Sequence, residues 1–65
     1  MQVTVNGETR DIRSGTVTEL LSELEISGSH IAVAINLQVI PRARHEATRL
    51  NEGDKVEIVH AVGGG

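Results

Sequence analysis

The sequence predicts an α+β domain in which one helix packs across a mixed sheet of four or five strands. Three observations carry this prediction. Apolar residues alternate with polar ones near both ends of the chain, one stretch between them has helical periodicity, and turn residues separate the segments. One helix laid across one sheet buries all of these apolar stripes at once. The chain of 65 residues is long enough for one such domain.

The first segment predicts a β-hairpin. Val3 and Val5 alternate with polar residues, which is the period of a half-buried strand. Asn6-Gly7 suits the two positive-φ positions of a type I′ turn. Residues 8–12 are therefore expected to form the returning strand.

The next segment predicts the helix. Thr16 and Glu19 have the spacing of a capping box, in which each side chain satisfies a free amide at the helix start. Ser27-Gly28 is expected to end the helix. The spacing i, i+3, i+4, i+7 gives one apolar stripe, which indicates core rather than chemistry; it consists of Val17, Leu20, Leu21 and Leu24.

The stretch "HIAVAINLQVIPR" predicts the third strand and a short fourth one. Ile31, Val33 and Ile35 fall on one face, and the small residues Ala32 and Ala34 fall on the other. A short strand is expected near residues 39–40. It should lie at an edge or stop there, because Pro41 has no N–H to donate.

The polar residues 42–54 predict a loop or one short helical turn, and "KVEIVHAV" predicts the last strand. Val56 and Ile58 should face the core, with Glu57, Val59 and Ala61 opposite. The first and last strands are expected side by side in the middle of the sheet, which is the β-grasp arrangement. We assign residues 1–62 to this domain and residues 63–65 to a flexible glycine tail.

Composition excludes several classes of function. The chain has no cysteine and no aromatic residue, so it can form neither a thiolate metal site nor a platform for stacking nucleic-acid bases. The net charge of −3 does not favour a phosphate backbone. No apolar run is long enough for a membrane span, and no signal peptide is recognisable. We expect a soluble, cytoplasmic protein that binds neither nucleic acid nor membrane.

The sequence also argues against an autonomous enzyme. A domain of this size has one modest core and no room for a deep pocket. The three histidines lack metal-ligand spacing. The terminal glycines are not followed by the lysine and helix of a phosphate-binding loop. We expect no metal, no bound cofactor and no ATP binding by the chain alone.

The order of elements and the end of the chain resemble the ubiquitin-like β-grasp proteins that finish in Gly-Gly. Among them the chain is most similar to the ThiS family, the small sulfur carriers of thiamine biosynthesis. The resemblance covers essentially the whole sequence. It is carried by the hairpin at Asn6-Gly7, by "AVAINLQVIPR", by "NEGDKVEIVHAV" and by Gly64-Gly65.

The resemblance implies a co-substrate whose reactive group is the carboxylate of Gly65. An E1-like adenylyltransferase of the ThiF type would adenylate this carboxylate with ATP. A cysteine desulfurase system would supply persulfide sulfur that displaces AMP. The resulting thiocarboxylate would donate its sulfur to a thiazole synthase of the ThiG type. Gly63 is treated as a hinge or spacer.

A docking surface is expected on the open face of the sheet, because contiguous exposed apolar area often marks an interface. Its expected members are Val59, Ala61 and Val62, with Ala34 and Leu37 as further candidates and Gly63-Gly64 leading to the reactive end. Two alternatives stay open. One is a carrier similar to the small subunit of molybdopterin synthase, and the other is a ubiquitin-like modifier or interaction module.

Overall fold

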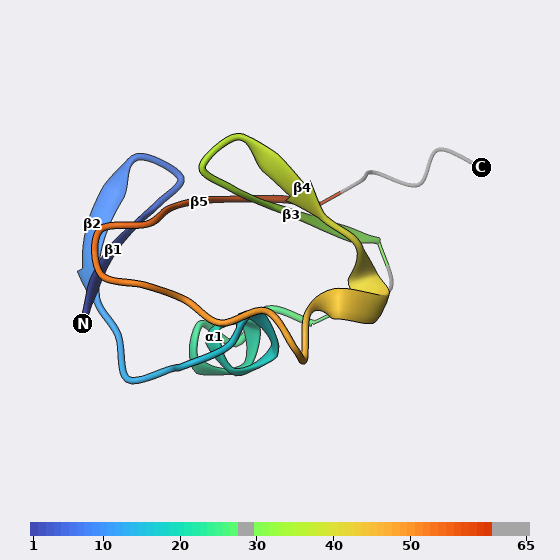
Figure 1. The fold of residues 1–65 in the computed structure, drawn as a ribbon, viewed down its shortest axis with the longest axis horizontal. Helices are drawn as coiled ribbons and strands as arrows, with labels where there is room; N and C mark the ends of the chain where they lie inside the picture. The colour runs from blue at the N-terminus through green and yellow to red at the C-terminus, as the bar shows by residue number, and fades with distance from the viewer. Residues whose placement is uncertain (28–29, 61–65) are drawn as a thin grey trace.

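The computed structural model describes residues 1–27 and 30–60. They form a five-stranded sheet in the order β2-β1-β5-β3-β4, with one helix on one of its faces (Figure 1). The elements are β1 (Gln2–Val5), β2 (Glu8–Asp11), α1 (Val17–Glu23), β3 (Ile31–Ile35), β4 (Gln38–Ile40), the 3-10 helix η1 (Arg42–Arg44) and β5 (Lys55–His60). The predicted α+β β-grasp arrangement is confirmed.

Strand β5 lies at the centre of the sheet. It runs parallel to β1, where Val5 is the partner of Val56, and antiparallel to β3, where Val33 is the partner of Ile58. One core of aliphatic residues lies between the sheet and α1: Val3, Val5, Ile12, Val17, Leu20, Val33, Ile35, Leu50, Val56 and Ile58. The expected inward faces of the strands are therefore confirmed.

Both hairpins turn through a pair of residues with positive φ. In the β1–β2 turn these are Asn6 (φ 49°) and Gly7 (φ 85°), as the Asn-Gly pair predicts. In the β3–β4 turn they are Asn36 (φ 51°) and Leu37 (φ 70°). Leucine rarely adopts this conformation, because its Cβ is crowded there.

The start of α1 has the predicted capping box. The Thr16 hydroxyl accepts from the amide of Glu19, and the Glu19 carboxylate accepts from the amide of Thr16, both at 3.2 Å. The segment between η1 and β5 satisfies two more amides of the helix start. The amide of Val17 donates to the carbonyl of Thr48, and the amide of Thr18 donates to the carbonyl of His45. These backbone amides of the first helical turn are therefore hydrogen-bonded within the protein rather than to water.

The helix end differs from the expected Ser27-Gly28. Helix α1 ends at Glu23, and Glu25 follows with φ 58°. The amide of Ile26 donates to the carbonyl of Leu21 and that of Glu25 to Ser22, which is the hydrogen-bond pattern of a Schellman motif. The motif usually places glycine where Glu25 stands, so the residue type at this position does not indicate the helix end. Gly28 lies outside the described residues.

Candidate functional site

The predicted reactive end follows directly on the central strand. Of the predicted partner-binding residues, the structure describes Val59, which lies on β5 with 57% of its surface exposed. Its neighbour His60 is also exposed. The other predicted site residues lie outside the described residues: Ala61, Val62, Gly63, Gly64 and Gly65.

Val59 belongs to a set of apolar side chains on the face of the sheet opposite α1. It is the partner of Ala32 on β3, and Ala34 is the partner of Val39 on β4. Since β3 lies between β5 and β4, Val59 lies beside Ala32 and Val39 lies beside Ala34. The β5 partner of Ala34 is the acidic Glu57, which borders this apolar strip. We call Ala32, Ala34, Val39 and Val59 the open-face patch. A partner surface can approach this strip closely, because alanine has only a methyl side chain.

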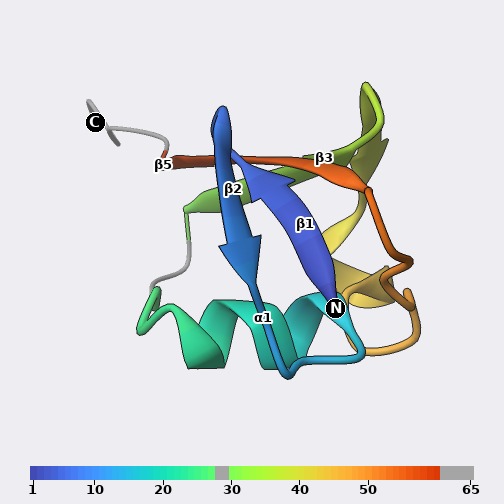
Figure 2. The ribbon, with the colours of Figure 1, turned by 90° about the vertical axis from the view of Figure 1, so that its left-hand side faces the viewer.

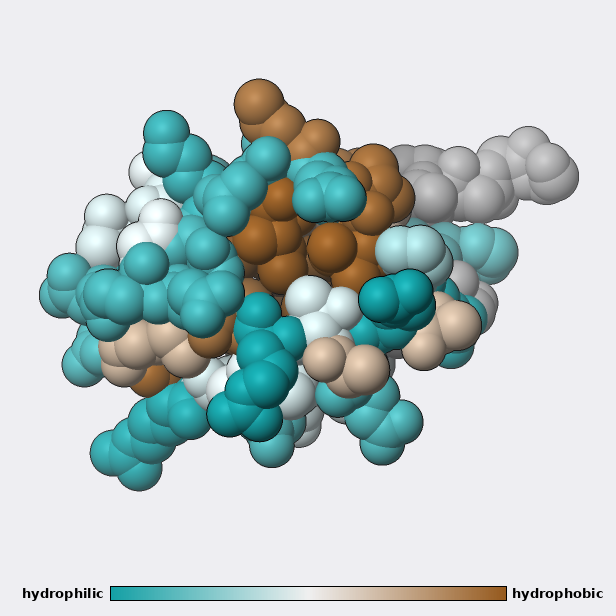
Figure 3. All heavy atoms as spheres, viewed as in Figure 1, coloured by the Kyte–Doolittle hydropathy of each residue, from teal (hydrophilic) through white to brown (hydrophobic). Residues whose placement is uncertain are grey.

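The open-face patch ends next to an exposed apolar turn. Leu37, at the tip of the β3–β4 hairpin, has 89% of its surface exposed. Figure 3 shows hydrophobic atoms gathered over this hairpin, with hydrophilic atoms around them. Contiguous exposed apolar area of this kind is typical of an interaction surface.

The sequence prediction placed Ala32 on the outward face of its strand without including it in the docking surface, and it missed Val39 altogether. Val39 is 70% exposed and lies on a strand of three residues. Alternation over three residues is too short to assign faces by period. Pro41 indicates where this strand ends, but it does not indicate that the side chain of Val39 points outward.

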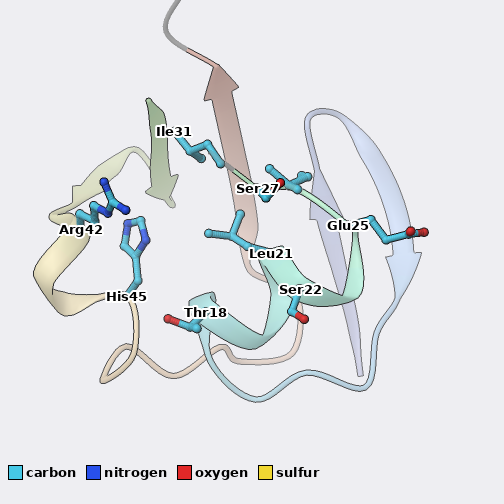
Figure 4. A pocket seen from close by; sticks show the side chains of 9 residues that line it. Thr18, Leu21, Ser22, Glu25, Ser27, Ile31, Arg42 and His45 are labelled. Atoms are coloured by element: carbon cyan, nitrogen blue, oxygen red, sulfur yellow. The ribbon is translucent and has the colours of Figure 1, made fainter. Parts of the chain in front are cut away.

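A pocket lies on the helix side of the sheet (Figure 4). It is lined by the end of α1 and the segment after it, by Ile31 and by the η1 region, including Arg42 and His45. His45 is buried, and its Nε2–H donates to the carbonyl of Ile40 at 3.1 Å. A carbonyl only accepts, so this contact fixes the tautomer. His45 therefore has a structural partner and needs no ligand.

The described residues contain no candidate cluster of metal ligands and no candidate membrane-spanning helix. Within residues 1–27 and 30–60, no group of three or more histidine, cysteine or carboxylate side chains could hold a metal ion. No helix within the same ranges has the length and apolar character to cross a bilayer. The open-face patch consists of aliphatic side chains, which can pack against another surface but have no group for an acid–base or nucleophilic step.

Comparison with known proteins identifies the family of the chain and supports its fold. The sequence model of the ThiS family matches residues 3–65. The chain is 32% identical over 66 aligned positions to the sulfur carrier protein ThiS of Escherichia coli, covering all of both chains. A crystal structure of the thiamine biosynthesis protein ThiS from Geobacter metallireducens matches with a TM-score of 0.86 and 36% identity over the whole of both chains.

A longer relative matches as well. The chain is 39% identical over 66 aligned positions to a thiazole synthase of Paramagnetospirillum magneticum. The match covers the whole of this chain and 20% of that protein. The chain thus spans about a fifth of the length of this relative.

Proposed function

Because the chain belongs to the ThiS family, we propose that it is a sulfur carrier protein of thiamine biosynthesis and a co-substrate rather than an enzyme. The observation that carries the proposal is the family match through residue 65, together with the end-to-end match to a sulfur carrier protein. We place it in the cytoplasm, because its activation consumes ATP.

We propose the carboxylate of Gly65 as the reactive group. A carboxylate is a poor electrophile, and adenylation gives it a good leaving group. One carboxylate oxygen attacks the α-phosphorus of ATP, and pyrophosphate leaves. The terminal sulfur of a protein persulfide then displaces AMP. A second thiol cleaves the S–S bond and supplies the two electrons that leave a thiocarboxylate on Gly65.

The glycine end suits entry into an enzyme channel. Three residues beyond Val62 extend the chain by about 10 Å, and none of them carries a side chain that would narrow the passage. We propose residues 1–62 as the folded domain and residues 63–65 as the arm. Gly64 lies next to the acyl carbon under attack, where a side chain would crowd the reaction.

The partners follow from this chemistry. We propose an E1-like adenylyltransferase of the ThiF type, a cysteine desulfurase system and a thiazole synthase of the ThiG type. The thiazole synthase receives separate support, because a segment similar to this chain forms part of a thiazole synthase polypeptide. A domain and an enzyme that share one polypeptide commonly act on each other.

We propose the open-face patch as the docking surface for the enzymes that take up the Gly65 terminus. Val59 belongs to the patch and precedes Ala61 and Val62 in the sequence. An enzyme that takes up residues 63–65 must approach the end of β5. Contact with Val59 and the alanine strip would then hold the domain against the entrance.

Intact mass spectrometry tests the proposal. The full chain is incubated with ATP, a persulfide donor and the candidate adenylyltransferase. We expect a mass gain equal to the replacement of one oxygen by sulfur. The gain should be absent in a variant without residues 64–65, which retains the whole of the proposed folded domain, residues 1–62, together with Gly63.

Other outcomes separate the alternatives. An unchanged mass with an adenylyltransferase that is active on another carrier contradicts the proposal. A product joined to a lysine by an amide bond instead supports a ubiquitin-like modifier. Transfer of the sulfur to a molybdopterin precursor but not to thiazole synthase supports the molybdopterin-type carrier.

A further inference from the structure

Strand β5 extends beyond the end of its parallel neighbour β1. At the end of β1, a backbone hydrogen bond runs from the Asn6 amide to the carbonyl of Val56 at 2.9 Å. The chain then turns away at Gly7, while β5 continues to His60. Figure 2 shows β5 continuing past the tip of β1.

The side chain of Asn6 replaces the missing strand at this point. Its Oδ1 accepts from the amide of Ile58 at 2.8 Å, and its Nδ2 donates to the carbonyl of Ile58 at 3.1 Å. An asparagine amide has the same donor and acceptor as a peptide group. Asn6 therefore adds one more pair of hydrogen bonds to those between β1 and β5.

The alternation of hydrogen bonds explains why Ile58 needs this partner. Asp54 and Val56 accept from the β1 side through their carbonyls, so the backbone groups of Ile58 face the same side. Strand β3 pairs with the other edge of β5. Without the Asn6 amide, β5 would have partners on both edges only as far as Val56.

We propose that Asn6 is a positioning residue for the reactive end of the chain. This inference rests on the proposed function. Strand β3 holds one edge of β5 as far as His60, and the Asn6 side chain holds the opposite edge as far as Ile58. Asn6 thereby fixes the course of β5 close to its last described residue. Without Asn6 the end of β5 would be held on one edge alone, and the extra freedom would have to be lost when the terminus enters the enzyme, which weakens productive binding.

The test replaces Asn6 by glycine. Glycine accepts the φ of 49° at this position without strain, so the variant removes the two side-chain hydrogen bonds and leaves the turn intact. Asn36→Gly is the matched control. Asn36 has φ 51° and its Oδ1 accepts from the amide of Lys55 at 3.0 Å, so it holds the start of the same strand.

Two readouts are measured at a temperature at which both variants are folded. Amide hydrogen exchange at Ile58 should be about tenfold faster in Asn6→Gly, as expected for the loss of its hydrogen bonds. In sulfur loading by the adenylyltransferase, the KM of the carrier should rise about fivefold to tenfold, while kcat changes less than about twofold. Asn6→Asp keeps the acceptor for the Ile58 amide and should recover part of the KM. Asn36→Gly should lose stability and keep the KM of the original chain.

Three outcomes overturn the proposal. One is an unchanged KM in Asn6→Gly despite faster exchange at Ile58. Another is an equal rise of KM in Asn36→Gly, which would indicate general destabilisation. The third is an original chain that gains no sulfur, which also overturns the proposed function. If the original chain is loaded and the two glycine variants have equal KM values, only the role of Asn6 fails.

Discussion

The Nδ2 of Asn36 donates to Oδ1 of the buried Asp54 carboxylate at 3.0 Å, and this contact ties the β3–β4 turn to the start of β5. The second carboxylate oxygen accepts from the amide of Asn51 at 2.8 Å. Asp54→Ala leaves both donors without this acceptor. We expect a loss of about 2–3 kcal/mol in the free energy of unfolding, measured by chemical denaturation.

Asp11→Ala is the control for this prediction. It makes the same substitution at a carboxylate whose side chain is 83% exposed and whose ion pair with the N-terminus is 3.6 Å long. Such a pair contributes little, so we expect a change within about 0.5 kcal/mol. Equal losses in both variants would show that the contact of Asp54 with Asn36 contributes no more to the free energy of unfolding than an exposed carboxylate does.

Leu37→Gly should stabilise the domain. Leu37 has φ 70° and is 89% exposed, so the substitution relieves crowding at Cβ and removes little packing. We expect a gain of about 1 kcal/mol, measured by thermal or chemical unfolding. Leu37→Ala keeps the Cβ and should give no such gain. A loss of stability in Leu37→Gly would mean that the leucine side chain contributes packing that its exposure conceals.

Where a structural rule depends on residue type, the sequence predicted the structure well. Asn6-Gly7 indicated its turn and Thr16 with Glu19 indicated the helix start, because few residues satisfy the backbone requirements at these positions. The predicted end of the helix was wrong, because the residue at the actual end is not of the type that the motif usually has. Glu25 adopts a conformation for which glycine is the usual residue, and tertiary packing of the segment overrides that preference.

The candidate site could be predicted only in part. The inward and outward faces of β3 and β5 follow from alternation, so Ala34 and Val59 were placed correctly. Val39 was missed because β4 is too short for a periodic pattern. The bond between Asn6 and Ile58 joins residues 52 positions apart, and no local pattern shows which side chain will meet the end of a neighbouring strand.

Glu23 should make stability depend on pH. The side-chain hydrogen bond from Ser14 holds the pKa of Glu23 below its ordinary value of 4.5. Desolvation is the second-largest effect and raises the pKa, whereas the amides of Arg13 and Ser14 and the charge of Arg13 lower it further. Because the folded pKa is lower than the unfolded one, the stabilisation is complete above the ordinary value. It is lost as the pH falls through the lowered pKa.

The measurement compares melting temperatures at pH 7 and near pH 3. Glu23→Gln should melt below the original chain at pH 7, and the difference should shrink in acid, where Glu23 of the original chain becomes protonated. Glu46→Gln, which changes an exposed carboxylate, should show no such convergence. A constant difference between Glu23→Gln and the original chain at both pH values would contradict the prediction.

Val59→Lys should weaken uptake of the carrier by its activating enzyme without unfolding the domain. Val59 is 57% exposed, so a lysine there remains hydrated in the free protein, but its charge must lose water when an apolar partner covers the open-face patch. We expect the KM of sulfur loading to rise about tenfold. Thr9→Lys is the control, because Thr9 is an exposed residue on β2, paired with Thr4 of β1, and β1 lies between β2 and β5. An equal effect of both lysines would point to net charge rather than to the patch, and no effect of Val59→Lys would exclude the patch from docking.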